Sequence, residues 1–287
     1  MRNGRYLVIA AVLLRAAGGL IWWLHRPEAI PSKPSAAAPA VGSCWNLDGT
    51  AARNAFPWPG TPVACTAPHT AEVYYLGQVD HDLIRREHSA KGDDKRVLDA
   101  TMYASARHTC GSLATQYLGG SWHDGQVAVV ANWVNPVSEG FFGCALAQVA
   151  DPGGQKLTAR TASLEGALSG AEKDALAVGC VDSAGGYVAC DQPHRSEYVG
   201  TYTVTPANAP FDATALASAV TTGCAQLVQS YLGAASGPAR ADVTVAYVGP
   251  TTAADWAGSD QTYACYAKTA VDVRGSIRNL GTRPLPT

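Results

Sequence analysis

Two copies of one short motif contain the residues in this chain whose types and spacing could do chemistry. The motifs Pro68-His69-x-x-Glu72 and Pro193-His194-x-x-Glu197 each place an imidazole three positions before a carboxylate. Zinc accepts nitrogen and oxygen ligands from such side chains, and a twofold arrangement could bring both pairs to one cation. An imidazole beside a carboxylate could also transfer protons in acid–base catalysis. The motif therefore admits two chemical interpretations, a metal site and an acid–base pair.

A structural interpretation of the same motif is favoured. A histidine that follows proline, lies near a cysteine and precedes a glutamate by three positions can fix a turn by bonding main-chain groups or that carboxylate. We therefore expect no catalytic residue, no cofactor and no metal. The residues expected to support the fold in this way are Pro68, His69, Glu72, Pro193, His194 and Glu197. A metal site built from His69, Glu72, His194 and Glu197 is the weaker alternative.

The rest of the sequence offers little that points to an enzyme or to nucleic-acid binding. The signatures HExxH, GxSxG, GxxxxGKS/T and GxGxxG are absent from the sequence. A charged stretch could gather a second metal, although such stretches usually stay solvated. Its candidate ligands are His81, Asp82, Glu87, His88, Asp93 and Asp94. The net charge of -2 and the lack of a long basic run exclude the electrostatic footprint expected of a nucleic-acid-binding protein.

The elements that would position the motifs also occur twice. Downstream of each motif, one cysteine begins a run that ends in Tyr-Leu-Gly, and a further cysteine closes the copy. The offset between copies is 125 residues at the histidines, 114 at the first of these cysteines and 121 at the last. Loop insertions between fixed elements produce such a drift, so the sequence predicts two tandem repeats of one module.

The eight cysteines fall four to each copy, and four cysteines allow three pairings. A three-residue loop over residues 184–186 would place Cys180 and Cys190 opposite each other across a hairpin, with Cβ atoms about 4.5–5.5 Å apart, near disulfide range. By analogy we expect Cys44 to bond Cys65. The remaining pairs would tie a helix to the closing strand: Cys110–Cys144 and Cys224–Cys265. Because no CxxC occurs, zinc binding by these cysteines is not favoured.

Hydrophobic periodicity predicts an α+β fold with the element order β-β-α-β-β in each copy. Helices are predicted over residues 97–118 and 213–232, with Asp212 capping the second and Gly119 and Gly233 ending both in the left-handed conformation. The predicted strands cover residues 72–79, 126–134 and 143–149 in the first copy and 197–204, 242–248 and 262–271 in the second. Each copy should be a small antiparallel sheet packed on one helix and stapled by disulfides.

The first copy carries two stretches that the second lacks. Residues 46–64 are rich in proline and aromatic residues and are expected to add surface, and residues 80–96 should form a solvated loop or a short helix. Binding specificity is expected in these unshared loops. Five aromatic residues gather near them, Trp45, Phe56, Trp58, Trp122 and Trp133. The alternative is that most of these side chains fill the core.

The N-terminus carries a candidate membrane anchor. Arg2 and Arg5 precede nineteen largely apolar residues, Tyr6–Leu24, and a stretch rich in Pro, Ala and Ser follows. Arg15 at mid-span costs about 2.5–3.5 kcal/mol on the insertion scale, which the Leu, Ile and Val residues offset at about 0.3–0.6 kcal/mol each. We favour a retained transmembrane helix, with the N-terminus in the cytoplasm and the body outside, where disulfides persist.

There are two alternatives to a retained anchor. Cleavage near Ala38 would secrete the protein, but this site lies far beyond the apolar stretch. Val41-Gly42-Ser43-Cys44 looks like a lipoprotein box, but lipidation of Cys44 would leave Cys65 without its disulfide partner. Both alternatives still place the body outside the cytoplasm.

These motifs together resemble a known family. The features are Gly42-x-Cys44, the two Cys-x-x-Pro-His-x-x-Glu motifs, a cysteine-bearing helix and the run 250–258 leading to Cys265. They resemble the septum formation domain of high-GC Gram-positive bacteria over about residues 42–270. The first copy departs from the pattern within residues 132–144, since it lacks a Trp between Pro136 and its final cysteine. The resemblance implies a secreted or membrane-anchored protein linked to septation and envelope assembly, with no defined activity.

The sequence thus predicts a signal anchor at residues 1–26, a Pro/Ala-rich linker at 27–41, a first septum-formation-like repeat at 42–160 and a second at 161–287 with a short C-terminal tail. We expect a membrane-anchored, non-enzymatic interaction or structural protein of the cell envelope. Its expected partner is an unidentified envelope protein or cell-wall component, not nucleic acid. The alternatives are a metal-dependent envelope hydrolase that uses the PHxxE motifs, and a secreted or lipid-anchored binding protein.

Overall fold

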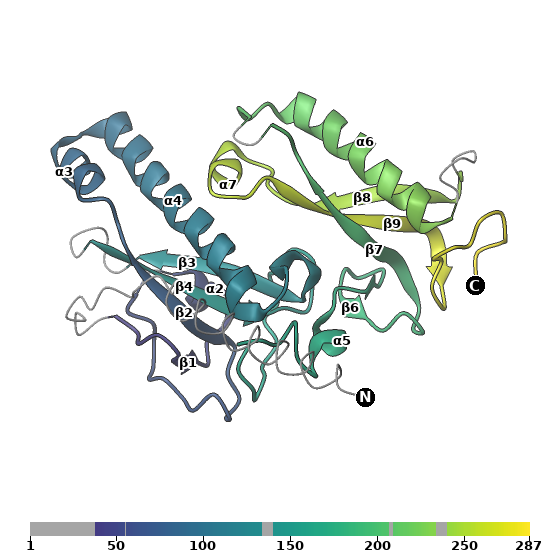
Figure 1. Cartoon of the computed structure of the whole chain (residues 1–287), viewed down its shortest axis with the longest axis horizontal. Helices are drawn as coiled ribbons and strands as arrows, with labels where there is room; N and C mark the ends of the chain where they lie inside the picture. Colours follow the sequence, from purple (N-terminus) through teal and green to yellow (C-terminus); the bar gives the residue numbers. More distant parts are fainter. Residues whose placement is uncertain (1–37, 55, 134–139, 207–208, 234–239) are drawn as a thin grey trace, which may run out of the picture. The chain divides into compact units, whose positions relative to one another are not determined.

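Two antiparallel sheets, each with one long helix across a face, make up most of the described chain (Figure 1). The computed structural model describes residues 38–287 except 55, 134–139, 207–208 and 234–239. The described residues all belong to one compact unit. The predicted membrane span lies outside the described residues, and none of the helices described has the length and apolar character that a membrane crossing needs. The arrangement confirms the predicted α+β class.

The first sheet has the strand order β1-β2-β4-β3. Its strands are β1 (Cys44–Trp45), β2 (Ala71–Gln78), β3 (Val127–Trp133) and β4 (Phe141–Gln148). The long helix α4 lies across one face (Figure 1). The helices of this half are α2 (Gly49–Arg53), α3 (His81–Ser89), α4 (Gly92–Leu118) and the 3-10 helix η1 (Trp122–Asp124). Met102 and Ala106 of α4 belong with Leu146 of β4 to one buried cluster, which forms the core on this face.

The second sheet has the order β6-β5-β7-β9-β8. Its strands are β5 (Cys180–Val181), β6 (Tyr187–Val188), β7 (His194–Thr203), β8 (Val243–Val248) and β9 (Thr262–Val273). The helices of this half are α5 (Lys173–Leu176), α6 (Ala213–Tyr231) and α7 (Ala253–Ala257). Val220 and Cys224 of α6 pack with Tyr263 and Cys265 of β9, so α6 covers one face of this sheet.

The two sheets share their registers at the cysteines. Cys44 pairs with Glu72 and Val63 in the first, and Cys180 pairs with Glu197 and Val188 in the second. The final cysteine of each half also has equivalent neighbours, Tyr75 and Ala131 beside Cys144, and Gly200 and Tyr247 beside Cys265. In both sheets the register shifts just past the residue that follows the glutamate. The shift lies between Val73 and Tyr75 in the first sheet and between Tyr198 and Gly200 in the second. The landmarks that recur in sequence therefore occupy matching positions in the two sheets.

The helix ends follow the predicted capping chemistry. Asp212 accepts hydrogen bonds from the main-chain N–H groups of Thr214 and Ala215 at the start of α6. Gly119 after α4 and Gly233 after α6 have φ values of 73° and 72°, which glycine adopts without steric cost. The start of α4 differs from the prediction, because the helix begins at Gly92 and not at residue 97. Polar residues in an exposed first turn give no hydrophobic period by which a sequence pattern could detect it.

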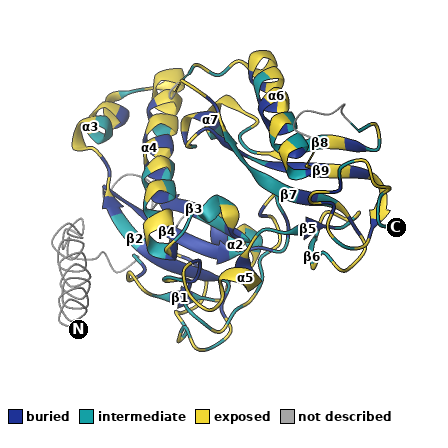
Figure 2. Cartoon of the chain, turned by 45° about the vertical axis from the view of Figure 1, so that its right-hand side comes forward, coloured by how far each residue is buried: buried dark blue, intermediate teal, exposed yellow. Residues whose placement is uncertain are grey.

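Residues 46–64 do not simply add surface, so that expectation was wrong. Leu47, Ala52, Phe56 and Trp58 are buried in a second cluster, against apolar side chains on the sheet face opposite α4. Phe56 and Trp58 meet edge to face, with ring centroids 4.6 Å apart. The strands of this sheet are accordingly buried, while the outer surface of α4 is exposed (Figure 2). The stretch serves as the cover of the sheet's second face.

Four disulfides join the pairs that the sequence predicts. The bonded pairs are Cys44–Cys65, Cys110–Cys144, Cys180–Cys190 and Cys224–Cys265. Two of them tie α4 and α6 to the central strands β4 and β9, and the other two tie β1 and β5 to the segment that precedes each PHxxE motif. Each bond closes within its own half. Four disulfides are typical of a protein outside the cytoplasm.

If residues 46–64 form a cover, a Phe56→Ala substitution should lower the unfolding free energy by about 3–5 kcal/mol. The ring of Phe56 is only 3% exposed, so its removal leaves a buried cavity. Urea unfolding of the full-length protein with disulfides intact measures this. Tyr247→Ala is the matched control, since that ring is 36% exposed and should cost about 1 kcal/mol or less. Equal losses in the two variants would show that the stretch is not part of the core.

Candidate functional site

The PHxxE motif of the second half is the centre of a buried hydrogen-bond network. Oε1 of Glu197 accepts from the main-chain N–H of Ile277 (2.8 Å) and lies 3.0 Å from Nε2 of His194. Oε2 accepts from the hydroxyls of Tyr231 (2.6 Å) and Ser276 (2.8 Å). Nδ1 of His194 lies 2.8 Å from the carbonyl oxygen of Gln192, so both ring nitrogens face acceptors. One carboxylate thus joins β7, the end of α6 and the C-terminal segment.

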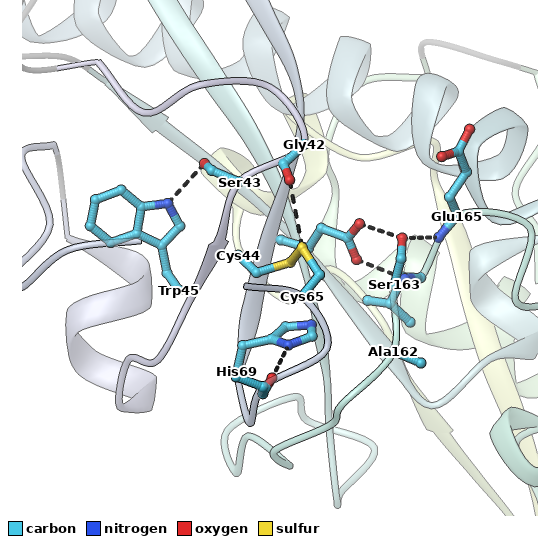
Figure 3. The surroundings of a disulfide bond; sticks show 12 residues. Gly42, Ser43, Cys44, Trp45, Cys65, His69, Ala162, Ser163 and Glu165 are labelled. Atoms are coloured by element: carbon cyan, nitrogen blue, oxygen red, sulfur yellow. Dashed lines mark hydrogen bonds between the residues drawn. A yellow bond between two sulfur atoms is a disulfide. The ribbon is translucent and has the colours of Figure 1, made fainter. Parts of the chain in front are cut away.

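The first half repeats most of this network. Oε1 of Glu72 accepts from the hydroxyls of Tyr117 (2.6 Å) and Ser163 (2.5 Å), and Oε2 accepts from the main-chain N–H of Leu164 (2.7 Å). Nδ1 of His69 lies 2.9 Å from the carbonyl oxygen of Ala67. Nε2 of His69 is buried without a hydrogen-bond partner among the described residues, which is where this copy differs from the second. His69 lies beside the Cys44–Cys65 disulfide, and Ser163 lies across from it (Figure 3).

We call residues 163–168 and 276–281 the first and second closing segments. Each one runs back over the end of its half's long helix. In the first, the N–H of Gly166 donates to the carbonyl of Tyr117; in the second, the N–H of Asn279 donates to the carbonyl of Tyr231, both at 2.8 Å. Gly166 and Asn279 share a left-handed backbone, with φ values of 68° and 54°. The glutamates therefore bind the same kind of turn in both halves.

The tyrosines in these networks remain hydrogen-bond donors. Burial raises the pKa of Tyr117 and Tyr231 above the ordinary tyrosine range, and the hydrogen bonds to Glu72 and Glu197 raise each pKa further. A phenol that keeps its proton can only donate to the neighbouring carboxylate. Tyr117 therefore donates to Glu72, and Tyr231 donates to Glu197.

The structure keeps the two PHxxE motifs apart, so the alternative in which His69, Glu72, His194 and Glu197 share one cation does not fit. Among the described residues, the close groups of potential ligands are Cys44 with Cys65 and Glu72, and Cys180 with His194 and Glu197. The cysteines in both groups are disulfide-bonded and cannot act as thiolate ligands. The carboxylate oxygens are already used by tyrosine, serine and main-chain donors. The described contacts of both carboxylates are therefore internal to the fold.

The charged stretch of α3 and α4 is likewise engaged in local ion pairs. Asp82 pairs with Arg85, Asp93 with Arg96, and Glu87 with Lys95. His88 lies 3.7 Å from Glu87. The pair between Glu87 and Lys95 joins the two helices, and Glu87 is only 3% exposed. The stretch forms short helical structure, one of the two outcomes expected of it.

A cavity of about 590 Å³ between the two sheets is the best candidate for a binding site. One wall is the edge strand β3, of which residues 127–131 all line the cavity, and the other is a face of β9. Because α6 packs on Tyr263 and Cys265, the alternate residues of β9 point to the opposite face of the sheet. Other residues that line it include Tyr103, Arg107, Trp122, His123, Thr262, Ala264 and Tyr266.

Three polar contacts hold the cavity walls together. The hydroxyl of Tyr198 donates to Oδ1 of Asp124 at 2.6 Å, and Nε2 of His123 lies 2.6 Å from Oδ2 of Asp260. Arg107 lies 3.4 Å from Asp255. Burial alone would raise the pKa of Asp260, but the hydrogen bond and charge of His123 outweigh it and lower that pKa below its ordinary value. The walls are thus fixed by side chains from both halves.

The structure separates the aromatic residues that the sequence grouped together. Trp45, Phe56 and Trp58 belong to the core on the α2 side of the first sheet. Trp122 stacks on His123 with ring centroids 3.7 Å apart and lines the cavity, and the side chain of Trp133 lies outside the described part. The cavity itself was missed, because its residues come from segments more than 100 positions apart that carry no shared motif. The Trp122–His123 pair, which follows Gly119-Gly120 after one intervening serine, is a local signal for it.

The comparison with protein families completes the description of the site. The model described as septum formation matches residues 41–265, which include the first sheet and the second sheet up to Cys265 of β9. The chain belongs to the septum formation family. The resemblance recognised from its cysteine and PHxxE motifs is therefore confirmed, and the septum formation family points to a role related to cell division. No curated protein and no solved structure matches the chain.

The buried carboxylates of this septum formation family member should be essential for stability. Glu72→Ala or Glu197→Ala should each lower the unfolding free energy by about 3–5 kcal/mol, because each change leaves several buried donors without an acceptor. Glu165→Ala is the matched control, an exposed glutamate in the first closing segment (Figure 3), and it should cost about 0.5 kcal/mol or less. Urea unfolding distinguishes the variants, and a loss from Glu165→Ala as large as from the other two would contradict this account.

Proposed function

We propose that this septum formation family protein is a membrane-anchored, non-enzymatic interaction protein that works outside the cytoplasm during septum formation. One contrast carries the proposal. The conspicuous PHxxE side chains are sealed inside the fold, while a cavity of about 590 Å³ lies between the two sheets. A protein built in this way offers a partner a site for binding but no reactive group from those motifs.

The burial of the PHxxE motifs argues against the hydrolase alternative. The exposed fractions are 1% for His69, 2% for Glu72, 0% for His194 and 1% for Glu197. A general acid or base must lie within hydrogen-bond reach of the group whose proton it moves. A substrate could reach these side chains only after the closing segments had moved away, which would also remove the donors that hold the glutamates.

The shared registers and closing segments support the proposal that the two halves are tandem repeats. Leu164 and Leu168 belong to the core cluster under α4, although the sequence assigned residues from 161 onward to the second repeat. We therefore extend the proposed first repeat to residue 168. Its closing segment corresponds to residues 276–281 of the second.

The proposed location rests on the disulfides and on the N-terminal sequence. Four disulfides favour an oxidising compartment. Cys44 is fully buried in its bond to Cys65, which favours an apolar N-terminal span over lipidation of Cys44 as the anchor. The proposed span is residues 6–24, with the body on the outer side of the membrane.

A site-specific photo-cross-linker tests this function in intact cells of the native host. With p-benzoylphenylalanine in place of Tyr103, which lines the cavity, irradiation should yield a covalent adduct with an envelope component. The same replacement of Tyr247, an exposed aromatic residue on β8 outside the cavity lining, should yield none. Protease added to spheroplasts should digest the body. Equal or absent adducts from both positions, or a body protected from protease, would contradict the proposal.

A further inference from the structure

We propose that the cavity binds an extended polypeptide segment, which adds to the open edge of β3 as a further strand. This inference rests on the proposed function and names the chemical class of the partner. An unpaired sheet edge presents a row of main-chain donors and acceptors, and only another extended backbone satisfies them in register. The cavity is where such an edge faces a second wall.

The edge of β3 is unpaired along the cavity. β3 is the last strand of the first sheet, and no residue that the structure describes, apart from those of β4, hydrogen-bonds the main chain of residues 127–131. The carbonyl of Gln126, just before β3, points toward β4, because it accepts a hydrogen bond from the N–H of Val149, the residue that follows β4. The alternation of an antiparallel pair then directs the main-chain groups of Val127, Val129 and Ala131 away from β4. These three residues provide the donors and acceptors for an added strand.

The protein already uses this edge for strand addition at the adjacent residues. The N–H of Gln126 donates to the carbonyl of Leu176 at 2.7 Å, and the N–H of Val178 donates to the carbonyl of Asp124 at 2.9 Å. Gly125 and Ala177 form an antiparallel bridge between these two bonds. A bound peptide would continue the line that residues 176–178 begin. The open edge is therefore continuous with a pairing that the fold already contains.

The lining of the cavity matches a strand partner. Five consecutive residues, 127–131, line it, and since strand side chains alternate between faces, consecutive lining shows that the strand presents its edge. The opposite wall carries Thr262, Ala264 and Tyr266, which are alternate residues of β9 on one face. A peptide paired with β3 would present its own alternate side chains to this wall.

The equivalent edge in the second half lacks the facing wall. Tyr247 of β8 pairs with Cys265 of β9, as Ala131 of β3 pairs with Cys144 of β4. Val245 of β8 therefore occupies the position that Val129 occupies in β3. Of β8, only Val248 lines the cavity. β8 is also an edge strand, but a peptide added to it would gain main-chain bonds without contacts from a second wall. The proposal is therefore specific to β3.

Selection from a library of random eight-residue peptides displayed on phage tests the inference, with the full-length protein held in lipid nanodiscs. Selected peptides are then synthesised with single N-methyl groups at each position. Methylation should weaken binding about tenfold or more at alternate residues, whose N–H groups face β3, and by less than about twofold at the residues between. The alternation is a signature that side-chain recognition alone does not produce.

Two matched proline variants provide the structural control. Val129→Pro removes a donor that points away from β4 and should weaken peptide binding about tenfold or more, while Val245→Pro should leave binding unchanged. If Val129→Pro fails to fold, the N-methyl series with the unaltered protein decides. No selected peptide, no alternation, or binding that survives Val129→Pro in the folded protein would overturn the inference. A cross-link from Tyr103 to a wall glycan, with no selected peptide, would overturn it and leave the proposed function standing.

Discussion

Each half of the structure depends on one buried carboxylate, which lies near the start of β2 in the first half and of β7 in the second. Glu72 and Glu197 are 2% and 1% exposed and accept hydrogen bonds from the last turn of the long helix and from the closing segment. Removing a charge from water is costly unless strong donors replace the water. Because those donors come from elements far apart in the chain, the carboxylate is satisfied only when strand, helix and closing segment are all in place.

The two halves differ in how the second face of the sheet is covered, and this difference creates the cavity. Residues 46–64 cover that face in the first half. The second half has only the tight turn between β5 and β6, so the face carrying Ala264 and Tyr266 looks toward η1 and the edge of β3. Contacts such as Tyr198 with Asp124 fix the approach but do not fill the space. The uncovered face of the second sheet thus becomes one wall of the cavity between the two halves.

Local patterns predicted the parts of this fold that depend on local chemistry. The disulfide pairs, the cap at Asp212 and the glycine ends of both helices all follow from short-range spacing. The closing segments were not predicted, because the role of a serine and an apolar residue there depends on a glutamate about 80 or 90 positions earlier. The burial of Phe56 and Trp58 was expected only as the alternative to surface exposure, and the cavity was not predicted, since the meeting of two sheets is a tertiary feature that no local period records.

The central claim, that each carboxylate locks its closing segment into the global fold, is tested most directly by native-state hydrogen exchange of the Leu164 and Ile277 amides. Each amide is buried and donates to a glutamate, at 2.7 Å and 2.8 Å respectively. We expect both amides to exchange only through global unfolding, with the same opening free energy as the amides of β4 that pair with β2 and the amides of β9 that pair with β7. Exchange of either amide through a local opening, at an opening free energy well below that of those strands, would contradict it.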